Sequence, residues 1–166
     1  HKVIIGQDQV IELLLAASPA NRFVLRELAL TELSRARALN MERRSSDARE
    51  AAMRATSVLD ETLARSPNDV AARTVLADAY VALGEIESAS GNTADARTDW
   101  ERALATVDAA PLAARQTDPL AVRAAALLDL GRIDEARPPV AELTSRGYRR
   151  PSFVALARAR GVSAAK

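Results

Sequence analysis

The feature that most constrains the fold is a pattern of small, bulky and small residues that recurs every forty or so positions. Each copy has an alanine, a bulky residue four positions later and a third core-type residue three positions after that. The copies are Ala55, Leu59 and Thr62; Ala96, Trp100 and Ala103; and Ala136, Val140 and Leu143. Spacings of four and three place these residues on one face of a helix. A repeat of this length predicts stacked helical hairpins.

Composition supports helices over strands. The chain contains 36 alanines, whereas aromatic residues make up only 3% of its 166 positions. Alanine is the strongest helix former and allows helices to approach closely. The β-branched and aromatic residues that fill a sheet are too sparse here to build one. We therefore predict an all-α fold.

Start and stop signals divide the chain into helices. The first helix is expected over about 21–40, and the second from a capping box of Asp47 and Glu50 to before Pro67. Asn68 or Asp69 should cap the third, which ends at Gly91.

The same signals continue beyond Gly91. Thr93 should open the fourth helix, and Asp118 should cap the fifth, which ends at Gly131. A sixth helix over about 134–146 contains Pro138 and Pro139, which should delay or kink its beginning. Gly147 closes that helix, and Pro151 begins a short last one.

About residues 20–160 resemble the tetratricopeptide repeat family. The family's motif residues correspond here to Tyr80, Leu83, Gly84, Gly91, Ala96, Trp100 and Ala103, and then to Leu120, Ala124, Leu127, Gly131, Ala136, Val140 and Leu143. Three features depart from the family: Glu87 replaces a large aromatic residue, the interval exceeds the family's usual ~34 residues, and the first helices are one to two turns longer. The C-terminal half also resembles tetratricopeptide tails of bacterial multidomain signalling proteins.

This resemblance implies a right-handed superhelical stack of three hairpins with a C-terminal capping helix. It also implies a concave face, made mostly by the first helix of each hairpin, that binds a peptide, a helix or a partner domain without catalysis. The family register assigns partner contacts to Asp78, Val81, Glu85, Ser88, Asp118, Ala121, Ala125, Leu128 and Asp129.

Residues 1–17 do not fit the repeat. The segment "KVIIGQDQVIELLLAA" resembles the lead-in to the nucleotide site of MoxR-type AAA ATPases. That resemblance implies a phosphate loop further along, in which backbone amides and a lysine cradle the phosphates. Lys2 and Lys166 are the only lysines and no such loop follows. We therefore treat residues 1–17 as a segment of uncertain origin, either added when the chain was expressed or swapped in, and 18–166 as the repeat domain.

The sequence contains few of the residues that catalysis requires. Cysteine is absent and His1 is the sole histidine, so thiolate chemistry and histidine-based triads are excluded. Asp95 with Asp99, and Glu85 with Glu87, are the paired carboxylates, but Asp95 suits the first turn of a helix through the helix dipole. We expect no enzyme activity, no cofactor and no metal, and we assign Trp100 to packing between hairpins.

Charge suggests one alternative function. The net charge is only +1, so no overall field favours nucleic acid or an anionic membrane. The C-terminus nevertheless gathers Arg146, Arg149, Arg150, Arg158 and Arg160, which could bind nucleic acid or another anionic ligand. We favour a protein or peptide partner over nucleic acid, expect no membrane insertion, and leave self-association open.

Compartment is not determined by the sequence. The chain begins with His1 rather than methionine, which suggests a fragment of a larger bacterial protein, in the cytoplasm or outside it. No signal-peptide pattern is present.

Overall fold

The computed structural model describes residues 21–109 and 116–162, and every regular element in these ranges is an α-helix. The helices are α2 (Arg22–Met41), α3 (Ser45–Arg65), α4 (Val70–Ala89), α5 (Thr93–Asp108), α6 (Thr117–Asp129), α7 (Ile133–Ser145) and α8 (Pro151–Ala159). No strand occurs in the described ranges, so the predicted all-α class is confirmed. None of these helices is long and apolar enough to cross a membrane.

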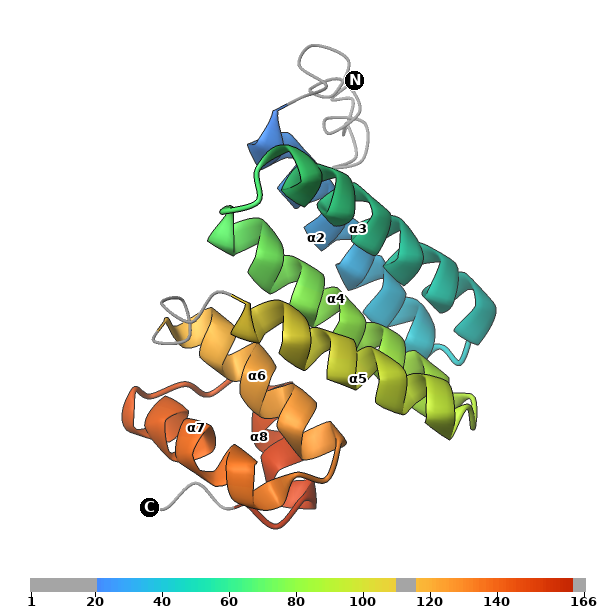
Figure 1. The fold of residues 1–166 in the computed structure, drawn as a ribbon. Coiled ribbons are helices and arrows are strands. Elements are labelled where there is room, and N and C mark those ends of the chain that lie inside the picture. The colour runs from blue at the N-terminus through green and yellow to red at the C-terminus, as the bar shows by residue number, and fades with distance from the viewer. Residues whose placement is uncertain (1–20, 110–115, 163–166) are drawn as a thin grey trace, which may run out of the picture.

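Successive helices pack in pairs, α2 with α3, α4 with α5 and α6 with α7 (Figure 1). The pairs are joined by contacts of α3 with α4 and of α5 with α6. In addition, α2 contacts α4, α4 contacts α6, and α6 contacts α8. The first helices of the three pairs therefore form one continuous row, which α8 extends.

The repeated pattern marks the core. All nine of its residues are buried, from Ala55, Ala96 and Ala136 with no exposed surface to Trp100 at 9%. The hairpin turns also repeat, because Gly91 and Gly131 have φ of +84° and +72° and are followed by equivalent backbone hydrogen bonds. The first turn places Arg43, with φ of +60°, at this position. Measured from the turn, Ala48 and not Ala55 matches Ala96, so the sequence alignment of the first copy is shifted by two helical turns.

Gly84 and Trp100 set the distance between α4 and α5. A Cβ atom added to Gly84 would lie 2.3 Å from Nε1 of Trp100 and 2.5 Å from its Cδ1. Only a residue without a side chain permits this approach. Nε1 of Trp100 is buried and has no hydrogen-bond acceptor among the described residues. The indole is thus held by packing.

The predicted caps are partly right. Asp69 caps α4, its side chain accepting a hydrogen bond of 3.0 Å from the backbone N–H of Ala72. Asp47 instead lies inside the first turn of α3 and accepts from the Arg44 guanidinium, so the capping box was wrong. Asp118 lies in the first turn of α6, whose N-cap is Gln116. In both helices the carboxylate interacts favourably with the positive end of the helix dipole, but it does not cap the helix.

Pro138 and Pro139 were predicted to delay or kink the beginning of α7, and the predicted delay is wrong. The helix begins at Ile133, five residues before the first proline. Asp134 and Glu135 stabilise its first turn through the helix dipole. Pro139 is itself buried in the fold with Ala136, so burial offsets the lost backbone hydrogen bonds.

Candidate functional site

The residues assigned to partner contact fall into two groups. Val81, Ala121 and Leu128 lie in the hydrophobic core, at 2%, 6% and 0% exposure, so their side chains are not available to a partner. The register that assigned them was too coarse to separate the packed from the open side of each helix. The remaining six are Asp78, Ala125 and Asp129, which are partly exposed, and Glu85, Ser88 and Asp118, which are exposed.

Asp78 links the first two helices of the row. Nη1 and Nη2 of Arg37 on α2 donate to its carboxylate at 3.1 and 2.7 Å. Burial works against the charge of Arg37, but Asp78 more than compensates and raises the pKa of the guanidinium, with a further contribution from Glu85. Two parallel hydrogen bonds of this kind fix geometry as well as charge. This ion pair therefore fixes α2 against α4 at the surface of the row.

Glu85 lies two turns along α4 from Asp78 and makes no ion pair with any described residue. Its side chain keeps an exposed surface, yet the protein around it displaces part of its water. This desolvation raises the pKa of Glu85 to about 7; Asp129 and Asp78 add to the rise by repulsion, and Arg37 opposes it. Glu85 is thus a carboxylate that has no ion-pair partner in the described ranges and is repelled by Asp78 and Asp129.

Asp129 ends α6 and is the most enclosed of these acids, with a side chain only 7% exposed. Its Oδ1 lies 3.5 Å from Nη2 of Arg160, whereas its Oδ2 is buried and has no hydrogen-bond partner among the described residues. Burial raises the pKa of Asp129 to about 6, although Arg160 acts in the opposite direction. A buried acceptor without a donor is unfavourable and rare in folded proteins.

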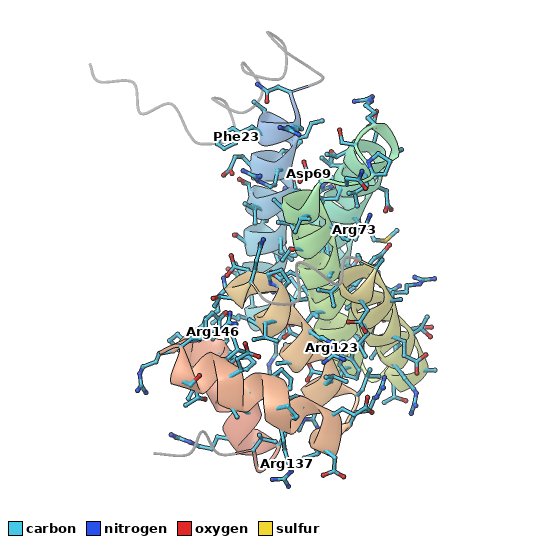
Figure 2. The ribbon with its side chains drawn as sticks, turned by 60° about the vertical axis from the view of Figure 1, so that its left-hand side comes forward. Phe23, Asp69, Arg73, Arg123, Arg137 and Arg146 are labelled. Atoms are coloured by element: carbon cyan, nitrogen blue, oxygen red, sulfur yellow. The ribbon has the colours of Figure 1, made fainter. Side chains whose placement is uncertain are left out.

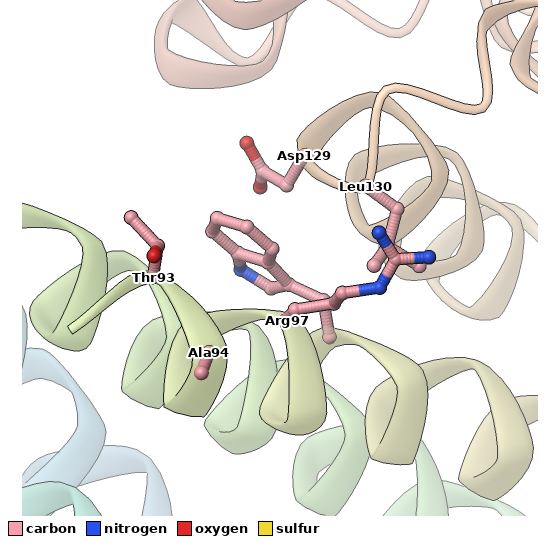
Figure 3. Close-up of a pocket in the computed structure, with 6 residues that line it drawn as sticks. Thr93, Ala94, Arg97, Asp129 and Leu130 are labelled. Carbon is pink, nitrogen blue, oxygen red and sulfur yellow. The ribbon is translucent and has the colours of Figure 1, made fainter.

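A pocket of about 370 Å³ lies beside Asp129. Thr93, Ala94, Arg97 and Trp100 line it from α5, and Asp129 with Leu130 line it from the end of α6. Figure 3 shows Asp129 and Leu130 facing the labelled residues of α5 across this space. Arg97 is engaged elsewhere, since its Nε donates to Glu101 at 3.0 Å. The volume is at the small end for a ligand site and suits one side chain.

Glu87 has a structural role that the sequence did not reveal. It is 3% exposed, forms an ion pair with Arg49 of α3, and accepts a hydrogen bond of 2.8 Å from the Asn92 side chain. Burial alone would raise its pKa, but these two partners lower it. The ion pair occupies the position where tetratricopeptide repeats prefer an aromatic residue. The partner Arg49 belongs to another hairpin, so no local pattern could have indicated it.

Two of the five C-terminal arginines are engaged in ion pairs. Arg146 pairs with Glu142, and Arg160 pairs with Asp129. Arg149, Arg150 and Arg158 are exposed. Figure 2 shows Arg73, Arg123, Arg137 and Arg146 on separate parts of the surface, so basic residues are spread over the molecule.

Two further predictions concern chemistry. In the described ranges, no three acidic, histidine or cysteine residues are grouped so that they could hold a metal ion. The ATPase-like segment at residues 1–17 lies outside the described residues.

The chain has no significant match among known protein families, curated proteins or solved structures.

Proposed function

We propose that this chain is a non-catalytic interaction module of the tetratricopeptide-like kind, belonging to a larger bacterial signalling protein. Its three hairpins would form a right-handed superhelical stack that α8 caps. The partner, a peptide, a helix or a protein domain, would bind along the row of α2, α4 and α6.

The observation that supports this proposal most is the direct contact of each first helix with the next, α2 with α4 and α4 with α6. A row of neighbouring helices offers one extended surface, which is how helical repeat proteins bind their partners. On this row, Glu85 and Ser88 are exposed within four residues of each other on α4. Exposed polar side chains on a rigid surface are suited to binding.

Charge reversal on the two faces tests the proposal. The full chain carrying Glu85→Arg is compared with the full chain carrying Glu61→Arg, since Glu61 is also exposed but lies on α3, outside the row. Affinity capture followed by mass spectrometry identifies the partner, and the two variants are then assayed against it. We expect Glu85→Arg to lose the partner and Glu61→Arg to keep it. Equal binding by both variants would refute docking on this row.

The alternative, binding of nucleic acid or an anionic ligand, rests on the exposure of Arg149, Arg150 and Arg158. Such binding must weaken with rising salt, because basic residues release counterions from the phosphates. Mobility-shift assays at low salt, with the double variant Arg149→Ala and Arg150→Ala, test it. Absence of binding by the unmodified chain at low salt excludes this alternative.

A further inference from the structure

The Asp129 carboxylate has no hydrogen-bond donor for one of its two oxygens among the described residues. Its side chain is 7% exposed, and Oδ2 has no donor in the described part of the chain. Arg160 reaches only the other oxygen, at 3.5 Å. A buried carboxylate oxygen costs free energy unless a donor, preferably a charged one, satisfies it. Asp129 also lines the adjoining pocket, from which a donor can approach its carboxylate group.

The walls of this pocket favour a planar cation. Trp100 contributes an aromatic ring, and tryptophan binds cations over its face more strongly than the other aromatic residues do. A guanidinium group has several N–H donors in one plane, so it can stack on a ring while donating to a carboxylate. A bare metal ion would require more oxygen ligands than are grouped here.

The cations around the pocket are already paired with acids, so the remaining negative charge there favours one more cation. Arg97, on the pocket wall, donates to Glu101, and Arg160 is engaged by Oδ1 of Asp129. Asp78 is neutralised by Arg37, whereas Glu85 has no ion pair in the described ranges. Repulsion by Asp129 is one of the causes that raise the pKa of Glu85. An incoming positive charge would relieve this repulsion.

We propose that the pocket between α5 and the end of α6 binds an arginine side chain of the partner, with Asp129 accepting from the guanidinium, Trp100 beneath it and Glu85 attracting it from α4. This inference rests on the proposed function, because the end of α6, which belongs to the row of first helices, forms one wall of the pocket, while α5 beside the row forms the other. The partner therefore carries an arginine in an accessible segment.

The test uses a short capped alanine peptide with a single arginine, and the same peptide with citrulline, a neutral side chain of nearly the same shape. Trp100 is the only tryptophan, so its fluorescence reports directly on the pocket of the full chain. Calorimetry provides an independent affinity. We expect saturable binding of the arginine peptide, and binding of the citrulline peptide at least about tenfold weaker, since an enclosed charge pair is lost.

Three variants separate the pocket from general charge effects. Asp129→Asn should weaken the arginine peptide at least about tenfold, and Glu85→Gln should weaken it by a smaller factor. Asp134→Asn, on α7, is the matched control, because the Asp134 side chain is fully exposed and its loss changes the net charge equally. Thermal unfolding checks that each variant is folded, and Glu85→Gln provides a second result at an exposed site.

Binding should also weaken as the pH falls from 8 to 5. Glu85 and Asp129 gain protons in this range. The other charged groups near them are Arg37 of α2 with its partner Asp78, Arg97 of α5 and Arg160 after α8. A group that served only structure would not produce this profile in the affinity.

Several outcomes would overturn the arginine site. These are equal affinity for the arginine and citrulline peptides, no saturable binding of either, a loss in Asp134→Asn as large as in Asp129→Asn, or affinity that rises toward pH 5. If the arginine site fails while Glu85→Arg still abolishes binding of the captured partner, docking on the row stands and only its chemistry is wrong. If Glu85→Arg keeps that partner, the proposed function itself fails.

Discussion

Replacing Gly84 by alanine should destabilise the protein, although the same change stabilises most helices. Gly84 lies in the interior of α4, where alanine is favoured over glycine by about 1 kcal/mol. The new methyl group, however, would lie within 3.0 Å of three ring atoms of Trp100. Trp100 is 9% exposed, so the ring has little room to move away.

The magnitude follows from two opposing contributions. Forcing an extra carbon into a packed core costs about 1–3 kcal/mol, and the closeness of this contact places Gly84→Ala at the upper end. After the helix-propensity gain of about 1 kcal/mol is subtracted, the free energy of unfolding should fall by about 1–2 kcal/mol. For a chain of this size the melting temperature should then fall by about 2–8 °C.

A double-mutant cycle tests the mechanism. The aliphatic Val140 occupies the position of Trp100 in the third hairpin, nine residues after the turn glycine, so Trp100→Leu is a conservative way to remove the ring. In that background, Gly84→Ala should become neutral or stabilising, by up to about 1 kcal/mol, which gives a coupling free energy of about 2 kcal/mol. Urea denaturation of the four proteins, followed by circular dichroism, measures each value. A destabilisation of equal size with and without the ring would refute the clash as its cause.

Three further changes have defined outcomes. Arg49→Ala leaves Glu87 buried without its cation, so the free energy of unfolding at pH 7 should fall by about 3 kcal/mol in urea denaturation, whereas Arg65→Ala, which breaks an exposed pair, should cost under about 1 kcal/mol. Asp129 has its folded-state pKa raised to about 6, above the unfolded value of about 3.9, so folding takes up a proton between these values and stability falls as pH rises from 4 to 6. Asp129→Asn should remove this decrease in stability and stabilise the protein at pH 8 by on the order of 1–2 kcal/mol. If the urea midpoints of the unmodified protein and the variant decline equally between pH 4 and 6, Asp129 is not the cause of the decrease. Arg43→Gly should raise the melting temperature, because φ of +60° is strained for arginine by about 1 kcal/mol and not for glycine; an unchanged or lower melting temperature would contradict this.

The helices could be predicted because the signals that define them are local. Small residues at spacings of four and three, and the glycines at two turns, are properties of neighbouring positions, and the structure buries all nine pattern residues. The shift in the first hairpin could not be seen, because α3 buries both Ala48 and Ala55 and only the turn distinguishes them. Arg43 hid that turn, since glycine is the residue expected at positive φ.

The site was less predictable because its properties depend on contacts between hairpins. Asp78, Glu85 and Asp129 were named from the family register, but the sequence does not show that Arg37 pairs with Asp78 or that Oδ2 of Asp129 has no donor. Val81 and Leu128 were assigned to the surface, yet packing of α4 against α6 buries both. Helical periodicity defines a face, and tertiary contacts decide how much of that face stays open.

The alanine-lined core has a consequence for how this protein tolerates mutation. Seventeen of the 36 buried apolar residues in the described ranges are alanines, many with no exposed surface. Truncation, the usual way to damage a core, removes almost nothing at these sites, whereas a larger residue at a fully buried position has to displace its packed neighbours. Sequence variation in the core should therefore be limited by a maximum side-chain size at roughly half its positions. A saturation-mutagenesis survey scored for folding would then show fitness at these alanines falling with the volume of the substituted side chain, even when that side chain is fully apolar.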